Sequence, residues 1–237
     1  MVSLPPHRRD ARFAEGLVTE GHEEGVTPHL TGDDEAMRPG QAMLTTTLSF
    51  QNMHQHGDLF VNLLRARRKS FIVRNNWRLP EAEGMEFDQY DTPASRWIAV
   101  HEKGEVLAGV RLTPTTARVG MYTYMIRDAQ RGMLDSIPSD LMDFEAPVDP
   151  KIWEASRIFV SNAVPAKLRK KVQGDLMYEM IRTARSLGAQ KIIAFGPAVW
   201  PRWIGRLGLR ADPAGPIMEL DGVKVQVAVM NLDPRLH

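Results

Sequence analysis

Apolar residues recur every three or four positions in several parts of the chain, which predicts helices. The longest such stretch covers residues 167–187 and stops at Gly188, a residue type that commonly ends helices. A second covers about residues 57–73. Shorter helices are expected at residues 124–131, 138–144 and 200–207.

Runs rich in β-branched residues predict the strands. Two of them are separated only by Lys103-Gly104, which predicts a tight hairpin, and Asp221-Gly222 predicts another near the end. The residues from 74 to 95 contain several prolines and glycines and are expected to form a loop. The expected strands are residues 96–102, 105–112, 151–160, 191–195, 217–220 and 223–230.

The order of these elements is helix, antiparallel strands, strand–helix–strand and a closing hairpin. It is typical of a single α/β domain with a mixed, mostly antiparallel sheet flanked by helices. Residues 43–237 are expected to form this domain. Residues 1–42 carry few large apolar side chains and cannot bury enough surface to offset their ordering entropy. We expect them to form a flexible N-terminal extension.

Composition excludes several classes of function. The formal net charge of +1 gives no overall preference for nucleic acid or membrane, and we find no nucleic-acid-binding motif. The absence of cysteine excludes disulfides and cysteine nucleophiles and fits the cytoplasm. No signal peptide is recognisable, and no apolar run approaches the roughly 20 residues that span a bilayer. His54 and His56 lack a third ligand at a familiar spacing, so no metal site is expected.

The segment from Arg67 to Asp91 combines charged and aromatic side chains. Arg67 and Phe71 lie on the predicted helix, and Trp77, Asp88 and Asp91 follow it. Aromatic rings can stack on a base or line a pocket, and the aspartates can hold a cationic group. In the alternative interpretation Phe71 is a core residue, Trp77 is a hydrophobic plug and the aspartates form turns.

A second cluster lies on the predicted strand 151–160, where Glu154 and Arg157 interrupt an apolar run. Together the two clusters offer carboxylates, guanidinium groups and aromatic faces. Such a combination suits a zwitterionic, cationic, nucleotide-like ligand.

Taken in order, these motifs resemble those of the acyl-homoserine-lactone synthases, the autoinducer synthases of quorum sensing. Order and spacing agree over about residues 45–230, which is nearly all of the chain outside the N-terminal extension. The matching positions are Arg67, Phe71, Trp77 and the segments 86–91, 109–115 and 152–157.

The resemblance implies an acetyltransferase-like (GNAT-like) fold and a reaction between two substrates, without a cofactor. S-adenosylmethionine supplies the amine and later the lactone atoms, and a thioester of acyl carrier protein or coenzyme A supplies the acyl group. The amine attacks the thioester to form an amide. The methionyl carboxylate then displaces methylthioadenosine and closes the homoserine lactone.

The amine of S-adenosylmethionine must lose a proton before it attacks, so a nearby carboxylate helps. Glu154 is expected to be this base, with Ser156 and Arg157 beside it in the catalytic group. In the alternative interpretation, Glu154 is an internal ion-pair partner of Arg157 or Arg111.

The resemblance also implies a set of residues that bind S-adenosylmethionine. The aspartates are expected to pair with the arginines and order the loop, and the aromatic residues are expected to wall the pocket. The set is Arg67, Phe71, Trp77, Asp88, Asp91 and Arg111.

Four cations stand at the start of the longest helix, where the helix dipole disfavours them: Lys167, Arg169, Lys170 and Lys171. A phosphate partner would account for them, either coenzyme A or the phosphopantetheine and acidic surface of a carrier protein. A merely solvated basic helix face is the alternative interpretation.

The acyl group is expected to contact residues near the next strand. Ala194 occupies a position where relatives that take 3-oxo acyl chains often carry Thr, which favours an unsubstituted or unusual acyl group. Ile158 and Ile137 replace residues that are commonly aromatic in the family, and both changes are expected to alter pocket shape. The residues expected to shape the pocket, or else to belong to the core, are Met177, Met180, Phe195, Trp200 and Trp203.

Two other functions compete with this interpretation. An ordinary acyl-CoA N-acyltransferase acting on another amine would keep the thioester chemistry but would not need the residues from Trp77 to Asp91. A non-catalytic protein that only binds one substrate is the second alternative. The intact Glu154, Asp88 and Asp91 argue against it.

Overall fold

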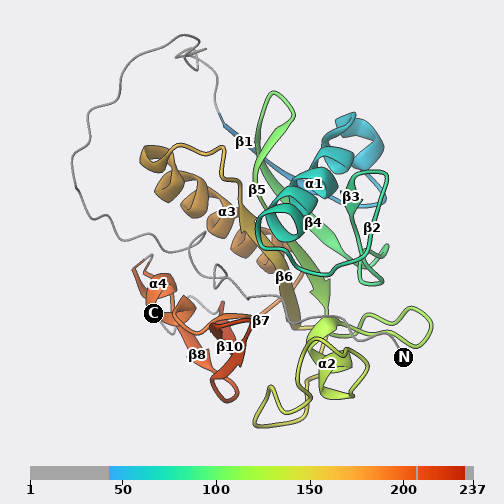
Figure 1. Ribbon diagram of the computed structural model, residues 1–237, viewed down its shortest axis with the longest axis vertical. Coiled ribbons are helices and arrows are strands. Elements are labelled where there is room, and N and C mark those ends of the chain that lie inside the picture. Colours follow the sequence, from blue (N-terminus) through green and yellow to red (C-terminus); the bar gives the residue numbers. More distant parts are fainter. Residues whose placement is uncertain (1–42, 207, 233–237) are drawn as a thin grey trace, which may run out of the picture.

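A computed structural model describes residues 43–206 and 208–232. The extension expected for residues 1–42 lies outside the described part of the chain. The described residues form one α/β domain around an eight-stranded sheet (Figure 1). All neighbouring strands are antiparallel except β6 and β7, which are parallel. The predicted fold class, a mixed and mostly antiparallel sheet with helices against it, is therefore confirmed.

The sheet has the strand order β1-β4-β5-β6-β7-β10-β8, and β9 pairs with β10. The strands expected from the sequence are all present with small changes at their ends. The bounds are β1 Leu44–Leu48, β4 Arg96–Glu102, β5 Glu105–Pro114, β6 Ile152–Val160, β7 Lys191–Pro197, β8 Ala211–Pro213, β9 Met218–Leu220 and β10 Val223–Asn231.

The helices follow the predicted periodicity with one local change. The 3-10 turn η1 (Met53–His56) precedes the first helix, α1 (Leu59–Arg68), and α1 continues into the π-helical turn η2 (Lys69–Arg74). The remaining helices are α2 (Met125–Gln130), α3 (Ala166–Ser186) and α4 (Trp200–Gly205). None of the described helices is long and apolar enough to cross a membrane.

The two faces of the sheet carry different helices (Figure 1). In β4, Ile98 and Val100 pack in the core under α3, whereas Trp97 and Ala99 pack in the core under α1. This alternation follows from the period of two in a strand. Beside α1, on that same face, a further apolar cluster surrounds α2 and includes Ile193 of β7.

Strands β6 and β7 separate halfway along their length. Pairing runs from Ile152 opposite Lys191 to Ala155 opposite Ala194, and both strands continue beyond these residues without pairing to each other. The sheet therefore opens between β6 and β7 after Ala155 and Ala194.

A bulge in β6 lies beside this opening. Between the pairs Gly109–Phe159 and Arg111–Ser156, β5 has one residue and β6 has two. Arg157 takes a φ of 54°, a conformation that is uncommon for residues other than glycine. Bulges of this kind redirect a side chain, and they are frequent next to active sites.

The sequence-based prediction is wrong in four places. Residues 138–144 are not helical, because this segment lies against the chain near Gly215: Asp143 N donates to Ala214 O, and a Cβ at Gly215 would lie 2.1 Å from Leu141 O. Strands β1 and β8 were not expected. The three β-branched threonines of β1 do favour a strand, and this signal was missed, whereas β8 is only three residues long. The expected loop 74–95 contains the short hairpin of β2 (Glu81–Ala82) and β3 (Met85–Glu86).

Candidate functional site

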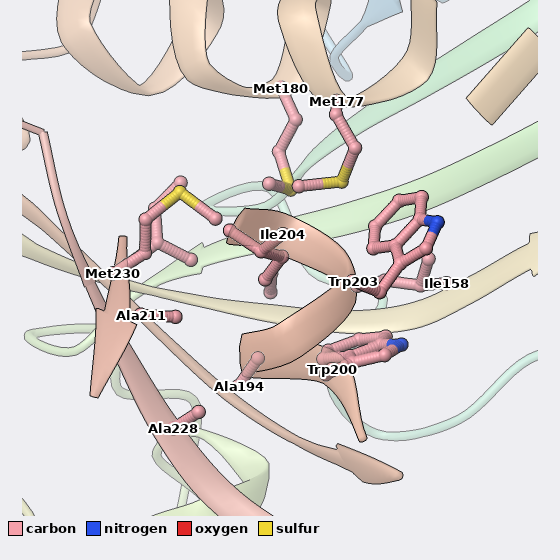
Figure 2. A pocket seen from close by; sticks show the side chains of 12 residues that line it. Ile158, Met177, Met180, Ala194, Trp200, Trp203, Ile204, Ala211, Ala228 and Met230 are labelled. Atoms are coloured by element: carbon pink, nitrogen blue, oxygen red, sulfur yellow. The ribbon is translucent and has the colours of Figure 1, made fainter. Parts of the chain in front are cut away.

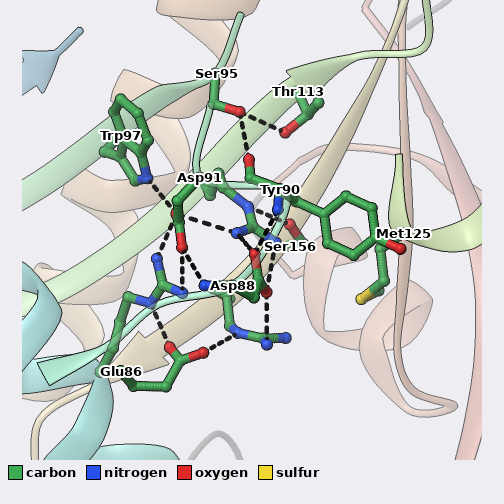
Figure 3. Close-up of polar contacts among 12 residues, drawn as sticks. Glu86, Asp88, Tyr90, Asp91, Ser95, Trp97, Thr113, Met125 and Ser156 are labelled. Carbon is green, nitrogen blue, oxygen red and sulfur yellow. Dashed lines mark hydrogen bonds and ion pairs between the residues drawn. The ribbon is translucent and has the colours of Figure 1, made fainter. Parts of the chain in front are cut away.

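The buried guanidinium groups of Arg67 and Arg111, the half-buried one of Arg157 and three carboxylates form a network on the α1 face of the sheet (Figure 3). Asp91 is its centre. The Asp91 carboxylate accepts hydrogen bonds from Arg67 at 2.7 and 3.0 Å, from Trp97 Nε1 at 2.8 Å and from the backbone N–H of Asp88 at 2.9 Å. It also lies 3.0 Å from Arg111 Nη1. Both oxygens of Asp91 are therefore occupied within the protein.

The other two carboxylates join the arginines to one another. Asp88 pairs with Arg111 Nη1 at 2.5 Å and with Arg157 Nη2 at 2.7 Å. Glu86 pairs with Arg67 Nε at 2.6 Å and with Arg157 Nε at 3.1 Å. The formal charges of the six side chains cancel, and the segment from Glu86 to Asp91 is tied to α1, β5 and β6. The expected pairing of aspartates with arginines is present.

Local structure directs these side chains to one place. Arg67 lies on the buried stripe of α1 that includes Leu63 and Leu64, and Arg111 lies between Val110 and Leu112, which face α3. Arg111 therefore points to the α1 face by strand alternation. The sequence analysis missed Glu86, which is fully buried and lies two residues before Asp88. Glu86 lies inside the segment 86–91 that matches the family, and this position could have identified it as a site residue.

Strong charge pairing keeps Asp88 and Asp91 ionised. Burial by itself would raise the pKa values of Asp88 and Asp91, but the positive charge of Arg111, with that of Arg157 on Asp88 and of Arg67 on Asp91, outweighs it. Both pKa values therefore lie below the usual range of an aspartate. The two aspartates therefore remain ionised at physiological pH.

Glu154 lies on the same face of the sheet but is held differently. Its carboxylate is completely buried and accepts hydrogen bonds from the backbone N–H groups of Ile126 (2.8 Å) and Met125 (3.2 Å) at the start of α2. Among the described residues it forms no salt bridge, so the ion-pair interpretation with Arg157 or Arg111 is wrong.

The environment of Glu154 changes its acidity. Burial raises its pKa to about 7, although the two N–H groups and the nearby charge of Arg111 act in the opposite direction. A carboxyl group with this pKa exchanges a proton readily near neutral pH, which suits a general base. The neighbouring Ser156 is also buried and accepts a hydrogen bond from Arg111 Nε at 3.1 Å, so it orients that guanidinium group.

Phe71 and Trp77 form a stacked pair, with ring centroids 5.1 Å apart and planes 12° from parallel. Phe71 is only 4% exposed, and it also packs edge-on against Phe159. Arg157 lies 5.9 Å from the Phe71 ring centroid. Of the two rings, the half-buried Trp77 is the better placed to meet a ligand, and Phe71 supports it from the core.

An apolar pocket lies on the opposite, α3 face of the sheet (Figure 2). It contains Ala194 and four of the five residues expected to shape an acyl pocket. Phe195 is the exception, since it packs against the α2 cluster on the other face. The lining residues are Ala155, Ile158, Met177, Met180, Ile192, Ala194, Trp200, Trp203, Ile204, Ala211, Ala228 and Met230.

Of the two isoleucines that replace aromatic residues, Ile158 lines this pocket. Ile137 does not; it packs against the α2 cluster. Ile137 is therefore not part of this apolar pocket, and its effect on pocket shape stays a prediction. Strand alternation decides the face of a strand residue such as Ile158. Ile137 lies in a loop, and a single sequence does not show which face of the sheet a loop residue packs against.

The pocket and the charged network meet at the opening of the sheet. Ala155 and Ala194, the last paired residues of β6 and β7, line the pocket on the α3 face. Glu154 precedes Ala155 and points to the other face. The place where the two strands separate therefore lies beside the pocket on one face of the sheet and beside Glu154 on the other.

The basic residues at the start of α3 lie near the end of β6. Lys167 and Lys170 are exposed, and Lys171 pairs with Asp175 at 2.7 Å. Arg169 donates to Ser161 O at 3.3 Å.

Arg74 of η2 joins these cations, although the sequence analysis did not select it. Arg74 Nη1 donates to Asn162 Oδ1 at 2.7 Å. Burial and the charge of Arg169 both lower the pKa of Arg74, which reflects the proximity of two cations. The concentration of positive charge in this region, drawn from η2 and α3, suits an anionic partner.

Comparison with known proteins agrees with the geometry. A profile of the autoinducer synthase family matches residues 50–235. An acyl-homoserine-lactone synthase of Vibrio anguillarum is 34% identical over 171 residues, which are 70% of this chain and 81% of that protein. One from Ralstonia solanacearum is 26% identical over 176 residues, 72% of this chain and 81% of that protein.

Solved structures of similar proteins share the fold. The CoA-dependent acyl-homoserine lactone synthase BjaI, solved with SAM and isopentyl-CoA, matches with a TM-score of 0.66 at 22% identity. The match covers 82% of this chain and 85% of that chain. The AHL synthase LasI matches with a TM-score of 0.68 at 20% identity and covers 82% of this chain and 92% of that chain.

Proposed function

The chain belongs to the autoinducer synthase family, and on this premise we propose that it makes an acyl-homoserine lactone from S-adenosylmethionine and an acyl thioester. The acyl thioester is one of acyl carrier protein or of coenzyme A. The observation that carries the proposal is the position of Glu154. This carboxyl group has a pKa near 7 and lies beside the charged network, at the opening of the sheet that leads to the apolar pocket.

The first step is amide formation. Glu154, directly or through a water molecule, takes a proton from the ammonium group of S-adenosylmethionine. The freed amine attacks the carbonyl carbon of the thioester, the C–S bond breaks, and the thiol leaves with a proton. Backbone N–H groups at the opening between β6 and β7 are the proposed donors to the oxyanion.

The second step is lactone formation. The methionyl carboxylate attacks the carbon next to the sulfonium, and the C–S bond breaks to release methylthioadenosine. The negative carboxylate becomes the lactone ester and the positive sulfonium becomes the thioether of methylthioadenosine, so neither product keeps a charge on these groups. Neither step transfers electrons to an acceptor, so we propose that no cofactor is needed. Both substrates are metabolites of the cytoplasm, and we propose that the reaction takes place there.

The network provides an ordered wall for S-adenosylmethionine. Because the oxygens of Asp88 and Asp91 are already occupied by arginines, these residues are proposed to position the segment from Glu86 to Asp91 rather than to pair with the ligand ammonium. Trp77 is proposed to contact the substrate directly. Arg67 and Arg111 hold the aspartates in place.

Turnover of defined substrates tests the proposal. Purified protein is incubated with S-adenosylmethionine and a panel of acyl-CoA and acyl-carrier-protein thioesters, and the products are identified by mass spectrometry. An acyl-homoserine lactone formed together with an equal amount of methylthioadenosine is the expected result. Release of free thiol without methylthioadenosine would instead identify an N-acyltransferase acting on another amine.

The rate should depend on pH through Glu154. The base works only when deprotonated, so kcat is expected to rise with pH and level off above the pKa of about 7. One pH unit below that value, kcat should be roughly tenfold lower. The kcat value is measured because it reports on the enzyme–substrate complex, so the titration of free S-adenosylmethionine does not affect it. A kcat that stays constant from pH 5.5 to 8, values chosen to bracket the pKa of about 7, would contradict the assignment.

Removing two positive charges at the start of α3 should change KM for the acyl donor but not KM for S-adenosylmethionine. The double replacement Lys170→Gln and Lys171→Gln is expected to raise KM for the thioester several-fold, since charge pairs at a rim mainly assist encounter. KM for S-adenosylmethionine should not change. Lys224→Gln, at an exposed position on β10, is the control. Equal increases in both KM values would show that the basic residues are not a donor site.

A further inference from the structure

The acyl pocket contains a buried hydrogen-bond donor without an acceptor. Trp200 is 7% exposed, and its Nε1 has no hydrogen-bond partner among the described residues. The other lining residues are alanine, isoleucine and methionine, apart from the partly exposed Trp203. Most buried polar groups in proteins are paired, because an unpaired one costs free energy. A donor left unpaired in a substrate pocket therefore indicates an acceptor on the substrate.

The orientation of the indole places this donor at the opening of the sheet. A Cβ at Gly196 of β7 would lie 3.2–3.3 Å from Cζ3, Cε3 and Cη2 of Trp200. These atoms are on the ring edge opposite Nε1, so the N–H points away from β7. Figure 2 shows the Trp200 nitrogen on the same side as Ile158. Ile158 belongs to β6 beyond its last pair with β7, so the N–H faces the separated strands.

We propose that the Trp200 N–H donates a hydrogen bond to an oxygen substituent on the acyl chain, a keto or hydroxyl group near the thioester end. This inference rests on the proposed function. A neutral acceptor fits the surroundings, because the apolar lining would penalise a charged group. Ala194 lacks the hydroxyl of the Thr found in relatives that take 3-oxo chains, which by itself favoured an unsubstituted acyl group. The Trp200 N–H supplies a hydrogen-bond donor to the same pocket, so the proposal replaces that expectation.

Space for the chain can come from the methionines. The Trp200 nitrogen is itself covered, so an acyl chain reaches it by displacing neighbouring side chains. Met177 and Met180 line the pocket from α3 (Figure 2). Methionine side chains adapt to new shapes at low cost.

Matched acyl donors test the proposal. The kcat/KM values of an unsubstituted acyl thioester and of its 3-oxo and 3-hydroxy counterparts of equal length are compared in the wild type and in Trp200→Phe. The replacement keeps an aromatic ring and removes the N–H. We expect kcat/KM to fall about tenfold for the oxygen-bearing donors and to change little for the unsubstituted one. Trp153→Phe is the control, because it removes another buried indole N–H that lies outside the pocket lining and has no hydrogen-bond partner within residues 43–206 and 208–232. It should leave the ratio between donors unchanged.

Two results would overturn the inference. One is an equal loss for all donors, which would mean that Trp200 contributes only its bulk, and the other is no loss for any donor. If Trp200→Phe does not fold, the wild type decides. It should prefer an oxygen-bearing donor about tenfold, and parity or the reverse preference would refute the hydrogen bond. Absence of lactone from every donor would instead reject the proposed function itself.

Discussion

Replacing Glu154 by Gln is expected to lower kcat by about 100- to 10,000-fold, the usual contribution of a general base. Glutamine has the shape of the protonated glutamate, and its carbonyl oxygen can still accept a hydrogen bond from the N–H of Ile126. The pocket should therefore keep its structure, and the affinity for S-adenosylmethionine should change little. Single-turnover kinetics measure the loss in the chemical step, and calorimetry measures binding.

Two controls separate lost chemistry from lost structure. Glu179→Gln removes another buried carboxylate, one that pairs with Arg182 on α3 and takes no part in the proposed reaction, and it should leave kcat unchanged. The second control is the stability of the variant fold. Because the pKa of Glu154 is raised from 4.5 to about 7 by folding, its ionisation destabilises the fold as pH rises through that interval. Glu154→Gln should thus be at least as stable as the wild type at pH 8. An unchanged kcat would remove Glu154 from the mechanism.

Replacing Asp91 by Asn is expected to destabilise the domain by about 3–5 kcal/mol, the typical cost of removing one partner from a buried ion pair. Arg67 and Arg111, each 1% exposed, would lose a counter-charge that solvent cannot replace. Since a domain of this kind is stable by only about 5–15 kcal/mol, the shift should be plain in urea denaturation. The midpoint should fall, and the dependence on denaturant should stay the same.

The pH dependence of this effect follows from the pKa of Asp91. The arginines hold that pKa below its unfolded value of 3.8, so the stabilisation is complete above 3.8 and declines as pH falls below it. The difference between wild type and Asp91→Asn should therefore shrink in acid. Asp212→Asn, which removes an exposed partner of Arg210, is the control and should produce no measurable change. If both variants are equally stable, the network does not support the fold.

Periodicity and motif spacing account for much of the architecture. The β-rich runs at residues 96–102 and 105–112, joined by Lys103-Gly104, predicted the β4–β5 hairpin, and the spacing of apolar residues in 167–187 predicted α3. Both elements are long or strongly periodic, so local preferences decide them. The segment 138–144 has no such pattern. Its conformation depends on contact with the chain around Gly215, and local preference does not contain that information.

Within the site, residue types were predictable and their partners only in part. Pairing of Asp88 and Asp91 with arginines was expected, because opposite charges in one motif attract. The hydrogen bonds from Met125 and Ile126 to Glu154 were not expected, since they depend on how α2 docks against β6. The raised pKa of Glu154 has the same origin, because burial is set by packing.

The sequence alone determined the order of the long elements, the family and most of the charged and aromatic residues of the site, because these depend on residue spacing along the chain. The tertiary structure alone decided where those residues stand across the sheet. Side chains alternate between the faces of a strand, so neighbours such as Glu154 and Ala155 serve opposite sides. The separation of β6 from β7 then joins the two sides. It arises from pairing between segments about forty residues apart, and contacts of that range are properties of the folded chain.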